Sequence, residues 1–472
     1  MTETELKKIM QMESVAVIAP AGHGKTEMIA DIVNASVGKQ LLLTHTNAGV
    51  AAIERRLQKR GIPKTKYTVT TIAAFCIKWC LSYVNTSTID ISLSPYKGGE
   101  ETKKYYAQMY NGAKRIFEHK WAGAVLRATY VGIVVDEYQD CVMAQHELVL
   151  TMNNYLPVRV FGDPMQGIMG FTGDLVVWSR IEFPIVTVDT KPWRWEKCNP
   201  DLGKYLMEVR ENLKPILQNQ RCQLQISPRN SSVEVIPTGE FTGYSHLREL
   251  SRYSTVVYIT RWPPRQLEIC RSLPGIFQYD EKQECDELFK YSGFLDKKDG
   301  AELLLAVVGF AKICMTGVSK ELKPYIDRLK TNDFDFSRIR KNTDFRDIIE
   351  ENTHNPTKDT VLKLLQWFSG NSAFKKYRTE LLSEMIRTVK YAIDKDITYF
   401  EAANHIRKDS ALQKHYTGFR FLSSRTSLSK GLEFDCVVID MRDPLPAKDF
   451  YVAMTRAMKK IYIISDSNVF SF

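Results

Sequence analysis

The chain has 472 residues, of which 44% are hydrophobic and 25% charged, so it is long enough for roughly two to four domains and ordinary in composition for a globular protein. These values exclude a disordered, collagenous or small disulfide-stapled chain. Lys and Arg outnumber Asp and Glu by 65 to 55, a net charge of +10. This excess fits a polyanionic partner and is equally typical of a basic enzyme without one.

Nine cysteines are scattered without a CxxC pair, and the N-terminus lacks the pattern of a signal or transit peptide. We therefore expect free thiols in a reducing cytoplasm. The most apolar stretch, residues 303–313, is far shorter than the roughly 20 residues of a membrane span and predicts a buried helix. We expect no membrane partner.

Short apolar segments alternate with helical segments in the first part of the chain, which predicts a parallel sheet covered by helices on both faces. The predicted strands are Val15–Ala19, Gln40–Thr44, Gly132–Val135 and Val158–Phe161, and the predicted helices include Glu27–Val33 and Ala48–Lys59. Residues 79–126 lack strands of this kind and are interpreted as a small insertion.

A second α/β series is predicted to start near Pro184. Its candidate strands are Ile185–Val188, Val233–Ile236, Thr255–Thr260, Phe419–Leu422, Cys436–Asp440 and Ile461–Ile464. Residues 278–408 are helical in pattern and mixed in charge, which indicates a second and larger insertion.

The first predicted strand continues into a glycine-rich segment, Ala19-Pro-Ala-Gly-His-Gly-Lys-Thr26, and then into a helix. This context is typical of a P-loop, whose backbone N–H groups and helix N-terminus bind phosphates. Lys25 would reach the β- and γ-phosphates of a nucleotide, and Thr26 would bind Mg²⁺. The GxxxxGK[ST] pattern departs at its first position, Ala19, and a chance glycine-rich turn is the alternative. The predicted phosphate-binding residues of the loop are Ala21, Gly22, His23, Gly24, Lys25 and Thr26.

Asp136 and Glu137 follow a buried strand in the segment Val131-Gly-Ile-Val-Val-Asp-Glu-Tyr-Gln-Asp140. Acidic side chains are rarely buried without a partner, so carboxylates at the end of such a strand indicate a functional role. Asp136 would hold Mg²⁺, directly or through water, and Glu137 would position and polarise an attacking water. A satisfied surface turn is the alternative.

Four segments in this order, VVDEYQD, FGDPMQGIMGF, SKGLEFD and YVAMTRA, closely resemble motifs of the UvrD/Rep type of superfamily 1 DNA helicase. The resemblance extends over nearly the whole chain. It implies an α/β fold with two RecA-like P-loop NTPase lobes, each with an inserted and mostly helical subdomain, and ATP in the cleft between the lobes. We accordingly expect a first lobe at residues 1–78 and 127–183 with its insertion at 79–126, and a second lobe at 184–277 and 409–472 with its insertion at 278–408.

The resemblance also assigns further ATP-site residues. Gln166 would link the γ-phosphate to the DNA site. Trp193 would stack on adenine, Arg194 would contact the γ-phosphate, Glu433 would contact the ribose, and Arg456 would be a second arginine finger. The predicted catalytic set is Lys25, Asp136, Glu137, Gln166, Arg194 and Arg456, acting with ATP and Mg²⁺. Two further nucleotide contacts are Gly431, beside the ribose-contacting acid, and Gln11, the nearest upstream candidate for the family's adenine-reading glutamine.

The DNA-facing segments match the family less well. Thr44-His-Thr-Asn47 resembles a Thr-Phe-Thr-Asn segment with His45 in place of the aromatic ring, and Thr71-Ile-Ala-Ala-Phe75 resembles Thr-x-His-Ser-Phe. Arg425 and Ser427 stand where the family usually shows Thr and His. Phe171 matches an aromatic that stacks on a base, with core packing as the alternative. The predicted DNA contacts are His45, Thr46, Asn47, Thr71, Phe171, Thr426 and Ser427.

Three functions remain open from the sequence. The first is a DNA-dependent ATPase that moves 3′→5′ on single-stranded DNA, or on DNA with a single-stranded tail, as a translocase or helicase. The second is an ATPase subunit that senses nucleotide and DNA and gates a partner nuclease, because the compact layout also resembles the helicase subunit of Gabija-type antiviral defence systems. The third is RNA remodelling, since tracking along a backbone discriminates little between sugars.

Overall fold

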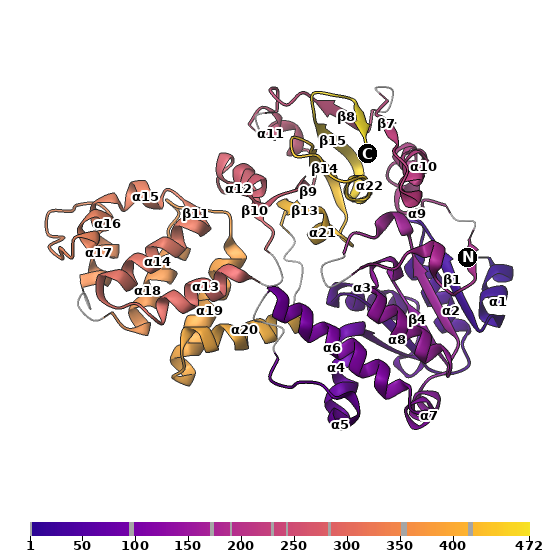
Figure 1. Ribbon diagram of the computed structural model, residues 1–472. Helices are drawn as coiled ribbons and strands as arrows, with labels where there is room; N and C mark the ends of the chain where they lie inside the picture. Colours follow the sequence, from indigo (N-terminus) through magenta and orange to yellow (C-terminus); the bar gives the residue numbers. More distant parts are fainter. Residues whose placement is uncertain are drawn as a thin grey trace. The chain divides into compact units, whose positions relative to one another are not determined.

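The computed structural model of the chain describes residues 2–93, 99–169, 174–188, 191–227, 231–241, 244–281, 285–350, 356–413 and 419–472 (Figure 1). The chain divides into two compact units. Unit 1 comprises Met1–Glu240 with Ser429–Phe472, and unit 2 comprises Phe241–Leu428.

A six-stranded sheet with the order β3-β2-β4-β5-β1-β6 forms the centre of unit 1, and all of its neighbouring strands run parallel. Its strands are β1 (Ser14–Ile18), β2 (Gln40–Thr44), β3 (Tyr67–Thr71), β4 (Gly132–Val135), β5 (Val158–Gly162) and β6 (Ile185–Thr187). Every residue of β2, β4 and β5 is buried, as expected for central strands covered on both faces. The carboxyl ends of β1, β4 and β5 therefore lie side by side at one edge.

Alternate side chains of each strand enter opposite cores. In β1, Val15 and Val17 join the core beneath α2, whereas Ala16 joins the core beneath α4 and α8. The helices of unit 1 are α1 (Glu3–Gln11), α2 (Lys25–Ala35), α3 (Asn47–Lys59), α4 (Ile72–Ser82), α5 (Val84–Ser87), α6 (Gly99–Phe117), α7 (Lys120–Thr129), α8 (Met143–Asn153), α9 (Trp193–Glu196), α10 (Pro200–Leu213) and α22 (Ala447–Met454). The helix α6 of the small insertion packs against α4 and α8, so this insertion shares the core of unit 1.

A second set of parallel strands has members in both units. Within unit 1, β8 (Val233–Ile236), β14 (Phe434–Asp440) and β15 (Ala457–Ile464) run parallel, and β7 (Gln223–Gln225) pairs antiparallel with β16 (Val469–Ser471). Within unit 2, β9 (Val256–Thr260), β10 (Gln278–Tyr279) and β13 (Phe421–Arg425) run parallel.

The remainder of unit 2 is mostly helical around one core of buried apolar side chains. Its helices are α11 (Tyr244–Leu250), α12 (Pro263–Ser272), α13 (Asp286–Leu295), α14 (Gly300–Cys314), α15 (Val318–Glu321), α16 (Lys323–Lys330), α17 (Thr343–Glu350), α18 (Lys358–Gly370), α19 (Thr379–Lys395) and α20 (Tyr399–Gln413), and α21 (Thr426–Ser429) spans its C-terminal boundary. The short strands β11 (Met315–Thr316) and β12 (Lys375–Lys376) form an antiparallel pair.

The predicted α/β class with two parallel sheets is confirmed, and the apolar stretch at 303–313 lies in the buried helix α14. One placement was wrong. The strand predicted at Ile185–Val188 exists as β6, but it pairs with β1 in the first sheet and does not open the second series. Its edge position explains the error, because pairing partners are chosen by tertiary contacts that a short apolar run does not specify. The four-part domain division stays a prediction.

Candidate functional site

The glycine-rich loop leaves β1 and leads directly into α2. Gly22 and Gly24 have φ angles of 72° and 82°, in the left-handed region that favours glycine. A Cβ on Gly22 would lie 2.5 Å from Cζ3 of Trp195, so the loop also needs glycine there for space. The residues from Ala21 to Thr26 thus form a tight turn at the N-terminus of an 11-residue helix, whose free N–H groups suit phosphate.

His23 is held inside this turn and does not face solvent. Its Nδ1 lies 2.8 Å from the carbonyl oxygen of Ala21, and the side chain is buried. Burial lowers the pKa of His23, so the ring is neutral near pH 7. The imidazole of His23 therefore supports the turn from inside, and the predicted phosphate contact at this position would come from the backbone and the shape of the loop.

An acidic pair faces the loop lysine at the end of β4. The Nζ atom of Lys25 lies 3.4 Å from Oε1 of Glu137, and the Glu137 backbone has φ 55°, which turns the chain sharply after the strand. Asp136 is 7% exposed, and its Oδ1 accepts a hydrogen bond from the Glu137 backbone N–H at 2.9 Å. The structure thus brings together Lys25, Asp136 and Glu137 as predicted from the sequence.

The two carboxyl groups are shifted in opposite directions. Burial, and then the charge of Glu137, raises the pKa of Asp136 to about 7. Burial alone would also raise the pKa of Glu137, but the charges of Lys25 and Lys430 outweigh it and hold that pKa well below its usual range. A buried carboxyl beside a carboxylate gains from a divalent cation, which would neutralise both.

The donor set fits a magnesium-bound nucleotide. Thr26 offers one hydroxyl and Asp136 one carboxylate, and Mg²⁺ is usually bound by one or two carboxylates together with water and phosphate oxygens. Within the described residues, no group of three or more His, Cys, Asp or Glu side chains could form a metal cage by itself. Thr26 and Asp136 would hold the ion, and the nucleotide phosphates would supply other ligands.

Two arginines approach the same site. The guanidinium of Arg456 is buried, with Nη2 3.5 Å from Oε1 of Gln166. Arg194 donates to the carbonyl oxygen of Thr455 at 2.7 Å and lies 2.8 Å from Oε1 of Glu433. Burial, followed by the charge of Arg194, lowers the pKa of Arg456 to about 9. Two neighbouring cations of this kind favour an anion between them, which is the chemistry of a γ-phosphate site.

Arg194 is also tied to the loop itself. Its backbone N–H donates to the carbonyl oxygen of Gly22 at 3.1 Å. The neighbouring Trp195 is buried, and its Nε1 donates to Ala457 at 2.6 Å. Arg194 and Arg456 are therefore positioned by one set of contacts that includes the phosphate loop.

Trp193 is 53% exposed and lies against the loop, since a Cβ on Gly24 would stand 3.4 Å from its Cδ1. An exposed indole beside a phosphate loop suits stacking on a base. Gly431 has φ 84° and no atom within 4 Å of a built Cβ, so conformation, not space, requires glycine. Gln11 is exposed at the end of α1, where Arg159 donates to the carbonyls of Ile9 and Met10 at 3.2 and 2.8 Å.

Sequence reasoning did not identify a set of polar residues that link these groups: Gln139, Asp140, Asp163, Arg210 and Lys430. Lys430 contacts Asp140, donates to the Gln166 carbonyl at 2.7 Å and lies 3.6 Å from Oε2 of Glu137. Most of these residues could have been noticed in the sequence, because all but Arg210 lie within the quoted motif segments. No sequence periodicity, however, distinguishes a side chain that links groups of the site from one that takes part in the reaction.

A second group of hydrogen bonds among these polar residues is centred on Asp163. It is fully buried and receives hydrogen bonds from Gln166 at 3.1 Å and Arg210 at 2.8 Å. Gln139 accepts from the Asp163 backbone N–H at 2.9 Å and donates to Glu137. Gln166 is thereby held in a network that reaches Glu137 on one side and Arg456 on the other.

The predicted DNA contacts are divided between the units. In unit 1, Thr71 pairs with Thr44 across β3 and β2, so the segment His45–Asn47 and Thr71 lie at the same edge of the sheet. Thr46 and Thr71 use their hydroxyls as helix caps, accepting from Gly49 and Ala74 at 3.0 Å each. Thr426 and Ser427 belong to unit 2, where Thr426 is buried. Phe171 lies outside the described residues.

His45 is turned inward. Its Nε2 lies 3.5 Å from Sγ of Cys141, and burial lowers its pKa, so the imidazole is neutral near pH 7. This contact holds Nε2 of the ring against the Cys141 thiol. All nine cysteines are free thiols, and among the described residues no helix is both long and apolar enough to cross a membrane.

Residues 2–172 match the model of the family described as AAA domain, which covers the phosphate loop, Asp136, Glu137 and Gln166. No curated protein matches the chain. Among solved structures, it is similar to the arterivirus nonstructural protein 10 (helicase) in complex with DNA, at 12% identity and a TM-score of 0.35, over 98% of this chain and 62% of that one. It is also similar to the PRRSV helicase, at 11% identity and a TM-score of 0.35, over 98% and 54%. A third is the Pif1 helicase from Candida albicans, at 11% identity and a TM-score of 0.37, over 99% and 94%. The chain thus spans under two thirds of the length of the first two.

Proposed function

We propose that the protein is an ATP-dependent DNA translocase or helicase of the UvrD type that moves 3′→5′ on single-stranded DNA. One observation carries the ATPase part of this proposal. Lys25, Glu137, Gln166, Arg194 and Arg456 come from distant parts of the sequence and converge on one phosphate loop. The polarity and the UvrD type rest on the motif resemblance alone.

Each residue has a distinct task in phosphoryl transfer, which depends on charge neutralisation and positioning more than on covalent chemistry. Lys25 and the loop N–H groups would bind the β- and γ-phosphates. Glu137, kept ionised by Lys25 and Lys430, would orient and polarise the attacking water. Arg194 and Arg456 would stabilise the charge that develops on the γ-phosphate, and bound Mg²⁺ would neutralise phosphate oxygens.

Gln166 is the residue best placed to transmit the state of the nucleotide. Its side chain contacts Arg456 and Asp163, and its carbonyl oxygen accepts from Lys430. In the sequence, Gln166 stands five positions before Phe171, the predicted base-stacking residue. Loss of the γ-phosphate would release Arg456 and with it one restraint on Gln166, which ties hydrolysis to movement on DNA.

The first test is ATP hydrolysis with and without single-stranded DNA, using the wild type and Glu137→Gln. Removing a general base costs about 10²–10⁴-fold in rate, whereas Glu208→Gln, the same chemical change at an exposed position of α10, should cost nothing. We expect DNA to stimulate the wild type and the control but not Glu137→Gln. Strand displacement only from a 5′ overhang would refute the proposed polarity.

The inward-facing His45 favours a second candidate, an ATPase subunit that senses DNA and nucleotide and gates a partner nuclease with weak unwinding of its own. The family's aromatic ring at this position is replaced by an imidazole that contacts Cys141, which weakens the predicted base contact. His45→Phe should then strengthen single-strand binding. Robust unwinding of long duplexes by the isolated wild-type chain would contradict the gating role.

A further inference from the structure

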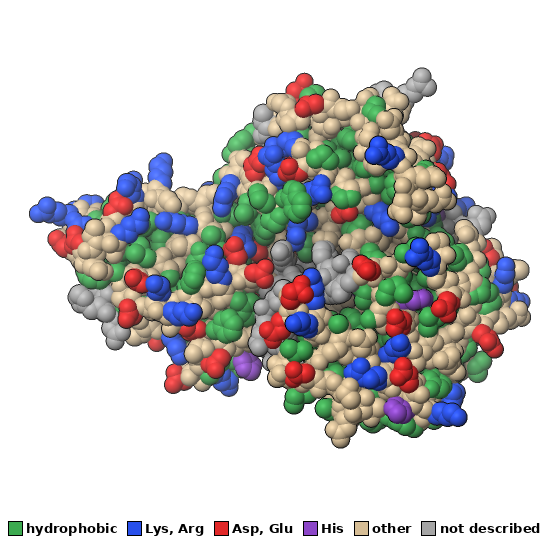
Figure 2. All heavy atoms as spheres, viewed as in Figure 1, with side chains coloured by type: hydrophobic (Ala, Val, Ile, Leu, Met, Phe, Trp, Pro, Cys, Tyr) green, Lys and Arg blue, Asp and Glu red, His purple; other side chains and the backbone are tan. Residues whose placement is uncertain are grey.

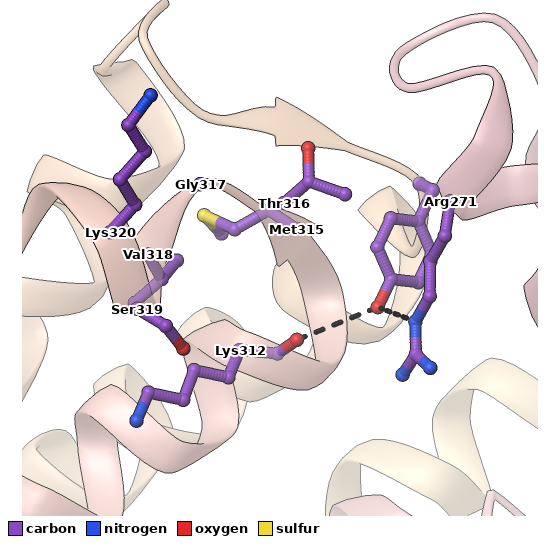
Figure 3. Close-up of a pocket in the computed structure, with 9 residues that line it drawn as sticks. Arg271, Lys312, Met315, Thr316, Gly317, Val318, Ser319 and Lys320 are labelled. Atoms are coloured by element: carbon purple, nitrogen blue, oxygen red, sulfur yellow. Dashed lines mark hydrogen bonds between the residues drawn. The ribbon is translucent and has the colours of Figure 1, made fainter.

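Unit 2 contains a pocket of about 280 Å³ that belongs to none of the predicted sites. It lies where α12, α14 and the turn between β11 and α15 meet (Figure 3). Its polar lining consists mainly of basic and hydroxyl side chains, namely Arg271, Lys312, Thr316, Ser319, Lys320 and Tyr377. No carboxylate lines it, so all of its charged groups are hydrogen-bond donors, which suit an anionic ligand.

Tyr377 organises one wall of the pocket. It is buried, and its hydroxyl accepts from Nε of Arg271 at 3.4 Å and donates to the Lys312 carbonyl oxygen at 3.5 Å. These two bonds appear as dashed lines in Figure 3. They engage Nε of Arg271, and no carboxylate among the described residues lies within ion-pair distance of its Nη atoms. The guanidinium therefore has a fixed stem with its remaining donors available.

The charge of the pocket is not balanced by ion pairs within the described residues. Within the described part of the chain, no ion pair involves Arg271, Lys312 or Lys320, whereas Lys298 pairs with Glu302 at 2.5 Å and Lys323 pairs with Asp327 at 2.6 Å. Figure 2 shows Lys and Arg side chains gathered over this edge of unit 2, near α15 and β11.

We propose that this pocket binds a phosphate group, and that the group is a backbone phosphodiester of nucleic acid. Guanidinium, ammonium and hydroxyl donors without acids are the chemistry of a phosphate site. The volume lies at the lower limit for ligand pockets and suits a small group better than a whole nucleotide. This identification of the ligand rests on the proposed function, which supplies nucleic acid as the substrate.

The arrangement of the cations favours a polymer over free phosphate. In Figure 3, Lys320 extends from the segment that follows the Gly317–Ser319 turn and Lys312 extends from α14, with the Ser319 hydroxyl between them and Arg271 at the opposite wall. Cations separated in this way can contact successive phosphates of one strand, whereas a single ion would need them to converge.

The test uses the full chain and the double variant Lys312→Gln/Lys320→Gln. The matched control is Lys298→Gln/Lys323→Gln, which removes the same charge from the same unit at ion-paired positions. Binding of a fluorescent single-stranded oligonucleotide is measured over a range of salt concentrations. Each lost phosphate contact lowers the slope of log K against log salt by about 0.7, so two contacts lower it by about 1.4 and weaken binding about 25-fold at 0.1 M salt. The control should leave the slope unchanged.

A second variant and a second ligand keep the outcomes distinct. Ser319→Glu places a carboxylate among the cations without removing a packed side chain, and it should weaken the oligonucleotide as the double variant does. In parallel, the rise in melting temperature with inorganic phosphate is compared between wild type and double variant. Loss of this rise with unchanged oligonucleotide binding would make free phosphate the ligand and overturn the phosphodiester assignment.

If the pocket variants match the control in both assays, the pocket is not a phosphate site. If the wild type binds no oligonucleotide, the proposed function fails by itself. The inorganic-phosphate comparison then decides the pocket separately, because it does not depend on DNA.

Discussion

Replacing Lys430 with methionine would leave a buried carboxylate without its cation. Lys430 contacts Asp140, and the two side chains are only 8% and 2% exposed. Asp140 also has one oxygen, Oδ1, without a hydrogen bond in the structure. Glu137 lies 3.6 Å from the same ammonium group but keeps Lys25 as a second partner. The perturbation therefore falls mainly on Asp140.

The expected cost follows from the burial. Removing one partner of a buried ion pair typically costs about 3–5 kcal/mol, because the other charge is left uncompensated. Removing both charges together should avoid most of this cost, because no uncompensated charge then stays buried.

Urea unfolding followed by tryptophan fluorescence at pH 7 measures this effect, since Trp178 and Trp195 are buried in unit 1. The double variant Lys430→Met/Asp140→Asn removes both charges and should regain most of the stability at pH 7. The reasoning is refuted if Lys430→Met costs less than about 1 kcal/mol at pH 7, or if the double variant is no more stable than the single one.

Three further predictions concern the phosphate loop and its neighbours. Gly22→Ala should abolish nucleotide binding, measured by titration with a fluorescent ATP analogue, because its Cβ would lie 2.5 Å from Trp195 at a φ of 72°; binding within twofold of wild type would contradict the assigned loop geometry. Trp193→Ala should raise the KM for ATP about tenfold, because the loss of stacking on the base costs about 1–3 kcal/mol. The melting temperature should not change, because the indole is 53% exposed. A fall in kcat alone would exclude stacking on the base. Without Mg²⁺, the contribution of Asp136 to stability should decrease as pH rises from about 4 to about 7, because its pKa is raised and the folded state binds the proton more tightly than the unfolded state. The difference between the melting temperatures at pH 5 and pH 7.5 should therefore be smaller in Asp136→Asn than in the wild type. Added Mg²⁺ should stabilise only the wild type at pH 7.5.

Much of the fold could be predicted from local sequence. The central strands of the first sheet are continuous apolar runs because both faces are covered, so β2 and β4 match the predicted bounds. The strand β3, with its sequence YTVTT, is half-buried and was not predicted. The strand β6 was predicted but assigned to the wrong sheet. Both lie at the edges of the first sheet, where burial is partial and the apolar pattern is weak.

The sequence by itself determined the chemical groups of the site. Phosphate binding needs glycines with positive φ followed by a helix, and a strand that ends in two carboxylates needs cations nearby, so these residues are recognisable in the linear order. The tertiary structure decided which side chains hold them. The contact of Arg210 with Asp163 spans 47 positions of the chain and that of Lys430 with Asp140 spans 290, and His45 contacts Cys141 because of what packs around it. Such contacts depend on the packing of separate elements, and local periodicity carries no record of them.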